Sequence, residues 1–162
     1  MSLQAKTRQR VLRFSLNDGG GALVEIAIVL PILLVLLASV GEFARFFHDY
    51  STLAKAVRTG ARYLSARPNA SGEITSTKNM VVCGKTAACV ANEAVVGGLT
   101  TSNVDVTTQG GIASAPEKIT VTITGYSFQP VFNLAGLTGV SGLSLAVPIS
   151  PSVTMRYLVA PN

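Results

Sequence analysis

Residues 22–41 read ALVEIAIVLPILLVLLASVG, and no other part of the chain constrains the architecture as strongly. Glu25 is the only charged residue in this stretch. About twenty apolar residues in a helix match a hydrocarbon core roughly 30 Å thick. A helix also satisfies its own backbone hydrogen bonds inside lipid. The stretch therefore predicts one transmembrane helix over residues 21–41.

The segment before this helix is polar and basic. It carries four positive charges and ends in three glycines, Gly19, Gly20 and Gly21. A basic start before an apolar run is also typical of a cleaved secretory signal. However, the run is longer than the usual signal core, and the small-residue site at its end would place Val40 next to the cut. We therefore favour a retained anchor, with residues 1–20 as a basic leader.

The composition limits the possible functions. The chain has 162 residues, which suffices for one modest domain beside an anchor, and only 13% of them are charged. The net charge is +5, but the basic residues are not interleaved with aromatic ones as in nucleic-acid binders. They fit a membrane-flanking signal and a solvated helix face, so we expect no nucleic-acid partner.

The helix is expected to continue beyond the membrane, over residues 42–67. Pro68 and Asn69 then end it, because proline cannot continue a helix. An apolar stripe runs along this second half beside a polar stripe of Lys55, Arg58 and Arg62, which predicts packing on a folded domain. The members of the apolar stripe are Leu53, Val57, Gly60, Ala61 and Leu64.

Four aromatic residues share one face of this predicted helix. Phe43, Phe46, Phe47 and Tyr50 recur at i, i+3, i+4 and i+7. Aromatic side chains at this position form a belt at the membrane interface. The same face would also suit packing against neighbouring subunits, and the sequence leaves both alternatives open.

Residues 68–162 are expected to form an extracytoplasmic domain. Residues 68–82 are rich in Ser, Thr, Asn and Gly and predict a loop. Residues 86–96 predict a short helix that ends at Gly97 and Gly98. Alternating apolar residues predict strands over 103–107 and 119–124, the second being the clearest strand signal in the chain.

The last third of the domain completes the predicted sheet. Residues 127–142 resemble a connecting loop, and residues 143–159 predict a strand broken by Pro148 and Pro151. The fold class is therefore α+β. A long N-terminal helix, first transmembrane and then amphipathic, packs on a small antiparallel sheet of three to four strands.

Cys83 and Cys89 are the only cysteines, and five residues lie between them. Two cysteines are too few for a zinc site when the only histidine, His48, is distant in sequence. Outside the cytoplasm a disulfide is the natural state, worth about 2 kcal/mol for so short a loop. Two unpaired, small apolar side chains remain the alternative.

The chain offers no recognisable catalytic centre. Its acidic residues are scattered, and it has neither a phosphate loop nor a G-x-S-x-G motif. We therefore predict no enzymatic activity, no catalytic or metal-ligating residues and no cofactor.

Glu25 is the most informative single residue. A carboxylate a few residues into a membrane helix is costly unless it has a partner, and such residues are functional candidates by default. From its position alone, Glu25 could also lie in the headgroup region or be protonated.

The context of Glu25 narrows these alternatives. A basic leader ends in Gly20, four residues follow, and Glu25 then opens an apolar helix. This order resembles the prepilin-peptidase signal of type IV pilins and pseudopilins. The resemblance implies cleavage after Gly20 by a membrane aspartyl peptidase, which makes Gly21 the new N-terminus. It further implies that Glu25 neutralises the amine of a neighbouring subunit in the filament. Three glycines precede the helix, but only Gly20 gives the usual spacing to Glu25.

Three further blocks make the resemblance more specific. Gly21 to Pro31, Glu42 to Arg45 and Ala56 to Tyr63 are similar to TadE-like minor pilins of the tight-adherence (Tad, Flp) pilus. The end of the chain is similar too, with the strand from Ile119 to Thr124 and the final strand from Val153 to Tyr157.

The resemblance implies a minor pilin or pseudopilin of a Tad-type type IV pilus, needed for pilus assembly and surface adhesion. Its expected partners are the prepilin peptidase, the major Flp-type pilin, sibling minor pilins, the inner-membrane pilus platform and the lipid bilayer. The chain would cross the inner membrane once, with its C-terminal domain in the periplasm, and could enter the extracellular pilus.

The role of Pro31 and the function of the whole protein each have an alternative interpretation. The resemblance implies that Pro31 lets the helix bend or melt as subunits leave the bilayer, and a static kink without consequence is an equal alternative. An unprocessed, membrane-anchored envelope scaffold and a tip adhesin are the alternative functions.

Overall fold

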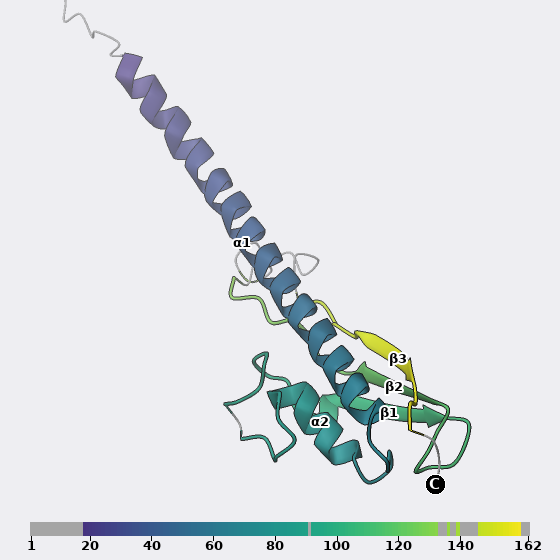
Figure 1. Cartoon of the computed structure of the whole chain (residues 1–162). Helices are drawn as coiled ribbons and strands as arrows, with labels where there is room; N and C mark the ends of the chain where they lie inside the picture. Colours follow the sequence, from purple (N-terminus) through teal and green to yellow (C-terminus); the bar gives the residue numbers. More distant parts are fainter. Residues whose placement is uncertain (1–17, 91, 133–135, 137–138, 140–145, 160–162) are drawn as a thin grey trace, which may run out of the picture. The chain divides into compact units, whose positions relative to one another are not determined.

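The computed structural model describes residues 18–90, 92–132, 136, 139 and 146–159. The chain divides into two compact units, one up to Ser39 and one from Val40 onward. Figure 1 shows helices α1 and α2 and strands β1, β2 and β3. Residues 1–17, which hold most of the predicted leader, lie outside the described residues.

Helix α1 spans Asp18–Ser65 and contributes to both units. It begins three residues before the predicted start at Gly21. In the first unit the apolar side chains of α1, such as Leu23, Leu30 and Leu37, are exposed. From Gly20 onward the helix is long and apolar enough to cross a membrane. A helix whose apolar side chains all face outward suits lipid rather than water.

The part of α1 in the second unit is amphipathic, as predicted. Leu53, Val57, Ala61 and Leu64 are fully buried. The predicted polar stripe of Lys55, Arg58 and Arg62 is exposed. The apolar stripe recurs every three or four residues, which is the spacing of one helix face.

Strands β1 (Val104–Gln109), β2 (Lys118–Ile123) and β3 (Ser152–Arg156) form one antiparallel sheet in the order β1-β2-β3. In the register, Val106 lies opposite Val121, which lies opposite Val153. Residues of this parity face the core, while the alternate residues face outward. The α+β class with a three-stranded sheet is confirmed.

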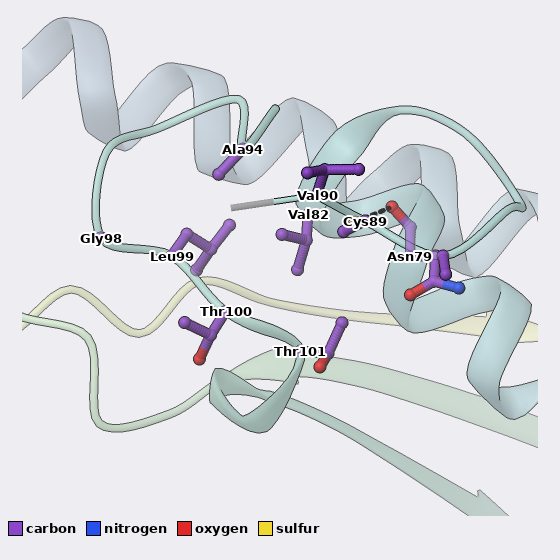
Figure 2. A pocket seen from close by; sticks show the side chains of 10 residues that line it. Asn79, Val82, Cys89, Val90, Ala94, Gly98, Leu99, Thr100 and Thr101 are labelled. Carbon is purple, nitrogen blue, oxygen red and sulfur yellow. Dashed lines mark hydrogen bonds between the residues drawn. The ribbon is translucent and has the colours of Figure 1, made fainter. Parts of the chain in front are cut away.

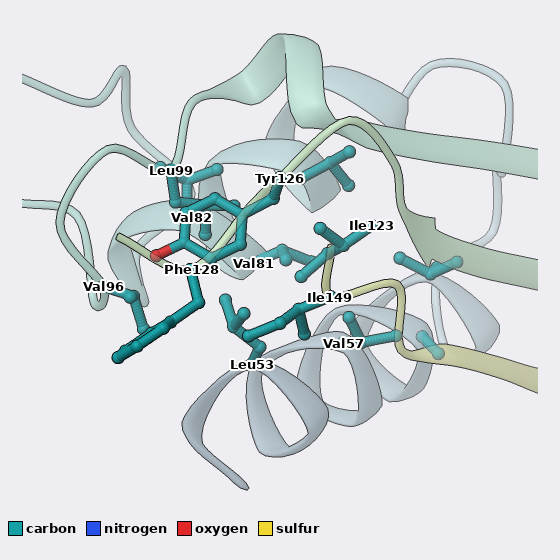
Figure 3. Packing of buried hydrophobic residues seen from close by; sticks show 13 residues of the cluster. Leu53, Val57, Val81, Val82, Val96, Leu99, Ile123, Tyr126, Phe128 and Ile149 are labelled. Carbon is teal, nitrogen blue, oxygen red and sulfur yellow. The ribbon is translucent and has the colours of Figure 1, made fainter. Parts of the chain in front are cut away.

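The core lies where α1 and α2 (Ile74–Cys83) meet the sheet. Figure 3 shows Leu53 and Val57 of α1 facing Val81, Ile123 and Ile149. A second cluster joins the end of α1 to the sheet through Leu64, Ala70, Ile119 and Tyr157. Full burial of a leucine, isoleucine or valine side chain stabilises the folded state by about 1.5–3 kcal/mol relative to leaving it exposed.

Two local predictions are wrong. Residues 68–82 were expected to be a loop, but α2 occupies Ile74–Cys83. Its polar composition is misleading because Thr77 is buried and its hydroxyl donates to the Glu73 carbonyl oxygen at 2.8 Å. The helix ends at Gly84, whose φ of 70° is left-handed.

The helix predicted over residues 86–96 is absent from the described part of that segment. The Cys83–Cys89 bond pulls the chain back toward α2. The Glu93 carboxylate then accepts a hydrogen bond from the Val90 N–H at 3.1 Å. The disulfide and this hydrogen bond favour a loop over a helix. A short 3₁₀ helix, η1 (Thr101–Asn103), leads into β1 instead.

The C-terminal expectations hold in outline. Among the described residues of 127–142, Ser127 pairs with Pro148 in an isolated bridge, and the rest of that described part contains no strand. Strand β3 begins directly after Pro151, so the two prolines limit the strand as expected. Much of the predicted connecting loop lies outside the described residues.

Gly60 tests the contact between α1 and α2. A Cβ added there would lie 2.4 Å from the Val81 Cγ2 atom, which is too close for a methyl contact. We expect Gly60→Ala to lower the unfolding free energy, because overpacking costs about 1–3 kcal/mol. That cost outweighs the helix-propensity gain of roughly 1 kcal/mol. Thermal unfolding of the full chain in detergent, followed by circular dichroism, measures the change.

Gly41→Ala is the matched control for this helix, since a Cβ at that position meets nothing within 4 Å. It should leave stability unchanged or raise it. Adding Val81→Ala to Gly60→Ala should remove the steric part of the loss. Equal stability of Gly60→Ala and the wild type would show that the two helices do not need glycine at their contact.

Candidate functional site

The predicted processing residues lie in the first turns of α1. Gly20 and Gly21 are exposed, and a Cβ at either position would meet nothing within 4 Å. Each glycine in a helix costs about 1 kcal/mol relative to alanine. Helix ends also lack some of their hydrogen bonds. The backbone around Gly20 is therefore uncrowded and only weakly held in helical form.

Glu25 lies one helical turn beyond Gly21, on the exposed surface of α1. Within the described residues its carboxylate forms no ion pair. A charged carboxylate in lipid requires a partner or a proton. Any partner must therefore come from outside the described part of the chain.

Pro31 lies within α1, which continues through it. Proline has no N–H, so the carbonyl of Ala27 lacks its usual helical partner. Glu25 and Pro31 thus bracket a short stretch in which the helix carries a charge and then a missing hydrogen bond.

Glu42 is a functional candidate that the sequence alone did not identify. It is only 2% exposed, although it is an acidic residue next to the apolar run. Its Oε1 atom accepts hydrogen bonds from the Val131 and Phe132 backbone N–H groups at 3.0 and 3.1 Å. Its Oε2 atom forms an ion pair with Arg45 at 3.2 Å. The carboxylate therefore holds a distant loop against α1.

Part of this arrangement could have been found from the sequence. Glu42 and Arg45 are three residues apart, a spacing that favours an ion pair on a helix. The loop partners are 89 and 90 residues away, and nothing in the local sequence indicates them.

The predicted aromatic face is divided in the structure. Phe46 packs edge-on against Phe128, with ring centroids 5.6 Å apart, and so belongs to the domain's own core. Phe43, Phe47 and Tyr50 are exposed. Only these three remain accessible to lipid or to a neighbouring subunit, and both alternatives stay predictions.

Cys83 and Cys89 are bonded to each other, with their Cα atoms 6.0 Å apart. An open pocket of about 400 Å³ lies beside this loop. Figure 2 shows its walls, which come from α2 through Asn79 and Val82 and from the segment before β1 through Leu99, Thr100 and Thr101. These side chains are apolar or neutral. Among the described residues that line it, the pocket therefore contains no pair of groups suited to acid–base chemistry.

An ion pair between Lys85 and Glu93 closes the loop next to this pocket. Lys85 and, second, the Val90 N–H lower the pKa of Glu93 below its usual range. In the described part of the chain, no group of three or more His, Cys, Asp or Glu side chains could hold a metal ion.

A polar contact fastens the end of α1 to the start of α2. The Tyr63 hydroxyl donates to the Glu73 carboxylate at 2.8 Å, and the Arg67 guanidinium lies 4.4 Å from the Tyr63 ring centroid. This hydrogen bond, and second that of Ser76, lower the pKa of Glu73. Burial, and second the bond to Glu73, raise the pKa of Tyr63.

Tyr63→Phe should reveal this contact as a pH-dependent stability difference. The lowered pKa of Glu73 means that its contribution is present above the ordinary value of 4.5 and is lost as the pH falls through the folded-state pKa. The raised pKa of Tyr63 means that its contribution is lost only at strongly alkaline pH. We expect the wild type to unfold at a higher temperature than Tyr63→Phe at neutral pH, with the gap shrinking in acid.

Phenylalanine keeps the ring under Arg67, so this substitution isolates the hydroxyl. Tyr50→Phe is the control, because the Tyr50 hydroxyl forms no hydrogen bond with the described residues. If the difference in unfolding temperature between the wild type and Tyr63→Phe stayed constant from neutral to acidic pH, the role given to Glu73 would be wrong.

Comparison with known proteins finds one similarity, confined to the N-terminal part of the chain. Residues 20–62 match the family model described as TadE-like protein. The match begins at Gly20, includes Glu25, Pro31 and Glu42, and ends within α1, so α2 and the sheet lie outside it. No curated protein and no solved structure matches the chain.

Proposed function

We propose that this chain, whose residues 20–62 match the TadE-like family model, is a minor pilin or pseudopilin of a Tad-type type IV pilus. Prepilin peptidase would process it, and it would be needed for pilus assembly and surface adhesion. The observation that carries the proposal is the order of features within the matched segment. An uncrowded Gly20 is followed by Glu25 and then by an exposed apolar helix.

The chemistry of processing follows from this order. Cleavage of the peptide bond after Gly20 would create an amine at Gly21, four residues before Glu25. Both groups would carry charge in an apolar surrounding, where neither is stable alone. A pair of opposite charges offsets much of the desolvation cost. The amine of one subunit and the Glu25 carboxylate of the next would thus set the axial register of a filament.

The proposed location is the inner membrane. Residues 1–20 would lie in the cytoplasm, residues 21–41 in the bilayer and residues 42–162 in the periplasm. The Cys83–Cys89 bond supports this orientation, because disulfides persist in oxidising compartments and are rare in the cytosol. The partners would be the prepilin peptidase, the major Flp-type pilin, sibling minor pilins and the inner-membrane platform.

The size of the second unit favours a minor subunit. It contains two helices, a sheet and a buried core. Such a domain suits a subunit that starts, regulates or caps a filament better than one that fills it. An adhesin role for the outer sheet face gains less support. Its Thr120 and Thr154 hydroxyls bond to each other at 2.8 Å, as do those of Thr122 and Ser152.

Mass spectrometry of the mature N-terminus tests the processing step. In cells with the cognate prepilin peptidase we expect loss of residues 1–20 and a new N-terminus at Gly21. In cells without the peptidase the leader should remain. An intact leader in both strains would instead favour an unprocessed envelope scaffold.

Glu25→Ala tests the assembly step separately. The variant should still be cleaved, because the scissile bond is unchanged, but pili should be lost because the amine of the neighbouring subunit has no counter-charge. Glu25→Gln, which keeps the shape without the charge, should behave in the same way, whereas Glu25→Asp should keep some assembly. Counting pili by electron microscopy measures the effect, and normal piliation by Glu25→Ala would refute the pairing.

A further inference from the structure

The buried Glu42 carboxylate determines where an exposed apolar loop lies. Its hydrogen bonds to the Val131 and Phe132 N–H groups hold the backbone of that loop at the level of residue 42 on α1. The side chains of Val131 and Phe132 are nevertheless exposed, Phe132 by 55%. A buried carboxylate therefore fixes the position of a loop whose two apolar side chains are exposed.

The same level of α1 also carries exposed apolar side chains. Val40, Phe43 and Phe47 all project outward, with Phe43 66% exposed. The Phe43 ring lies 6.2 Å from the Phe47 ring and 6.3 Å from that of Phe46, which anchors this part of α1 to the core through Phe128. We name the five exposed residues Val40, Phe43, Phe47, Val131 and Phe132 the collar. The collar joins two segments distant in sequence and lies wholly within the second unit.

We propose that the collar is a lipid-binding surface that seats the domain in the interfacial layer of the bilayer. The inference rests on the membrane anchor of the proposed function. The apolar run ends at Gly41, so Phe43 and Phe47 follow it by about 3 and 9 Å along a helix. The interfacial layer on each side of the hydrocarbon core is roughly 5–8 Å thick, so Phe43 falls within it and Phe47 at its outer edge. Glu42 brings Phe132 to this same level.

The charges near the collar fit lipid as the occupant. Between residues 40 and 52, Arg45 is the only lysine or arginine, and it is paired with Glu42. The Glu42–Arg45 pair carries no net charge, and Asp49, the other acidic residue of this stretch, lies 3.5 Å from His48. Aromatic and apolar side chains are favoured in this layer. Binding should therefore depend on apolar burial and not on anionic headgroups.

Tryptophan fluorescence of the full chain in vesicles tests the proposal, because the chain has no tryptophan of its own. Phe132→Trp, reconstituted in phosphatidylcholine vesicles, should show blue-shifted emission. Lipids brominated near the headgroup should quench it more strongly than lipids brominated near the chain end. Adding anionic lipid to the vesicles should change the emission wavelength and the quenching only slightly.

Two matched tryptophan variants make the result specific. Leu34→Trp lies in the predicted span and should be quenched most by bromine near the chain end. Ile112→Trp is also an exposed apolar position, but it belongs to the turn that contacts Ala70 through Ser114, beyond the far end of α1. That place is about 30 Å from the collar along the helix. Its emission should stay unshifted and unquenched.

The same probe tests the role of Glu42. Glu42→Ala in the Phe132→Trp background should weaken the quenching, because the loop loses the acceptor that holds it at this level. Glu42→Gln retains one carbonyl oxygen for the two N–H groups and should weaken it less. Circular dichroism checks that both variants remain folded. Undiminished quenching in a folded Glu42→Ala variant would overturn this role.

The remaining outcomes separate the hypotheses. Quenching of Leu34→Trp without quenching of Phe132→Trp would overturn the collar but keep the anchor. No quenching of Leu34→Trp would overturn the anchor, and with it both proposals. The Phe132→Trp emission could instead shift with the protein-to-lipid ratio and remain unquenched by brominated lipids. That result would assign the collar to a contact with a second copy of the chain and overturn the lipid assignment.

Discussion

The burial of one stripe of α1 organises the whole second unit. Leu53, Val57, Ala61 and Leu64 are fully buried, and both core clusters include members of this stripe. The apolar face of a sheet must be buried against another element of structure, and α1 covers it here. Gly60 lets α2 approach the same stripe closely, because any side chain there would meet Val81. The sheet and α2 are thus both built around a helix that begins in the first unit.

Glu42 shows how this arrangement places a charge at an unusual position. A buried carboxylate is tolerated only when hydrogen bonds and an opposite charge offset its lost hydration. Glu42 has both, from two backbone N–H groups and from Arg45. The Arg45 guanidinium also lies 5.7 Å from the Phe128 ring centroid, so the ion pair and the aromatic contact support each other. Because these partners come from a distant loop, the carboxylate fixes tertiary structure and not only the helix.

Patterns with a strong physical period were predictable from the sequence, whereas contacts between distant segments were not. The apolar run, the amphipathic stripe of α1 and the Val and Ile alternation of β2 were all read correctly, since burial imposes their spacing. Helix α2 was missed because Thr77 and Asn79 are buried polar residues that imitate a loop. The predicted helix over 86–96 failed because the disulfide and Glu93 outweigh local helix propensity. At the site, Glu25 was visible as a charge in an apolar run, but Glu42 lay at its edge and resembled an ordinary surface residue.

The border between the matched segment and the rest of the chain has a physical meaning. Residues 20–62 contain Gly20, Glu25, Glu42 and most of the buried stripe, so they carry both the apolar run that is long enough to cross a membrane and the surface on which the domain packs. The remainder has to supply two N–H groups for Glu42, an aromatic edge for Phe46 and apolar side chains over Leu53 and Val57. These contacts constrain which residues can occupy the inner face of the sheet, but they do not constrain the residues of its outer face. A single helix can therefore specify how the domain packs against it without specifying what the outer face of that domain contacts.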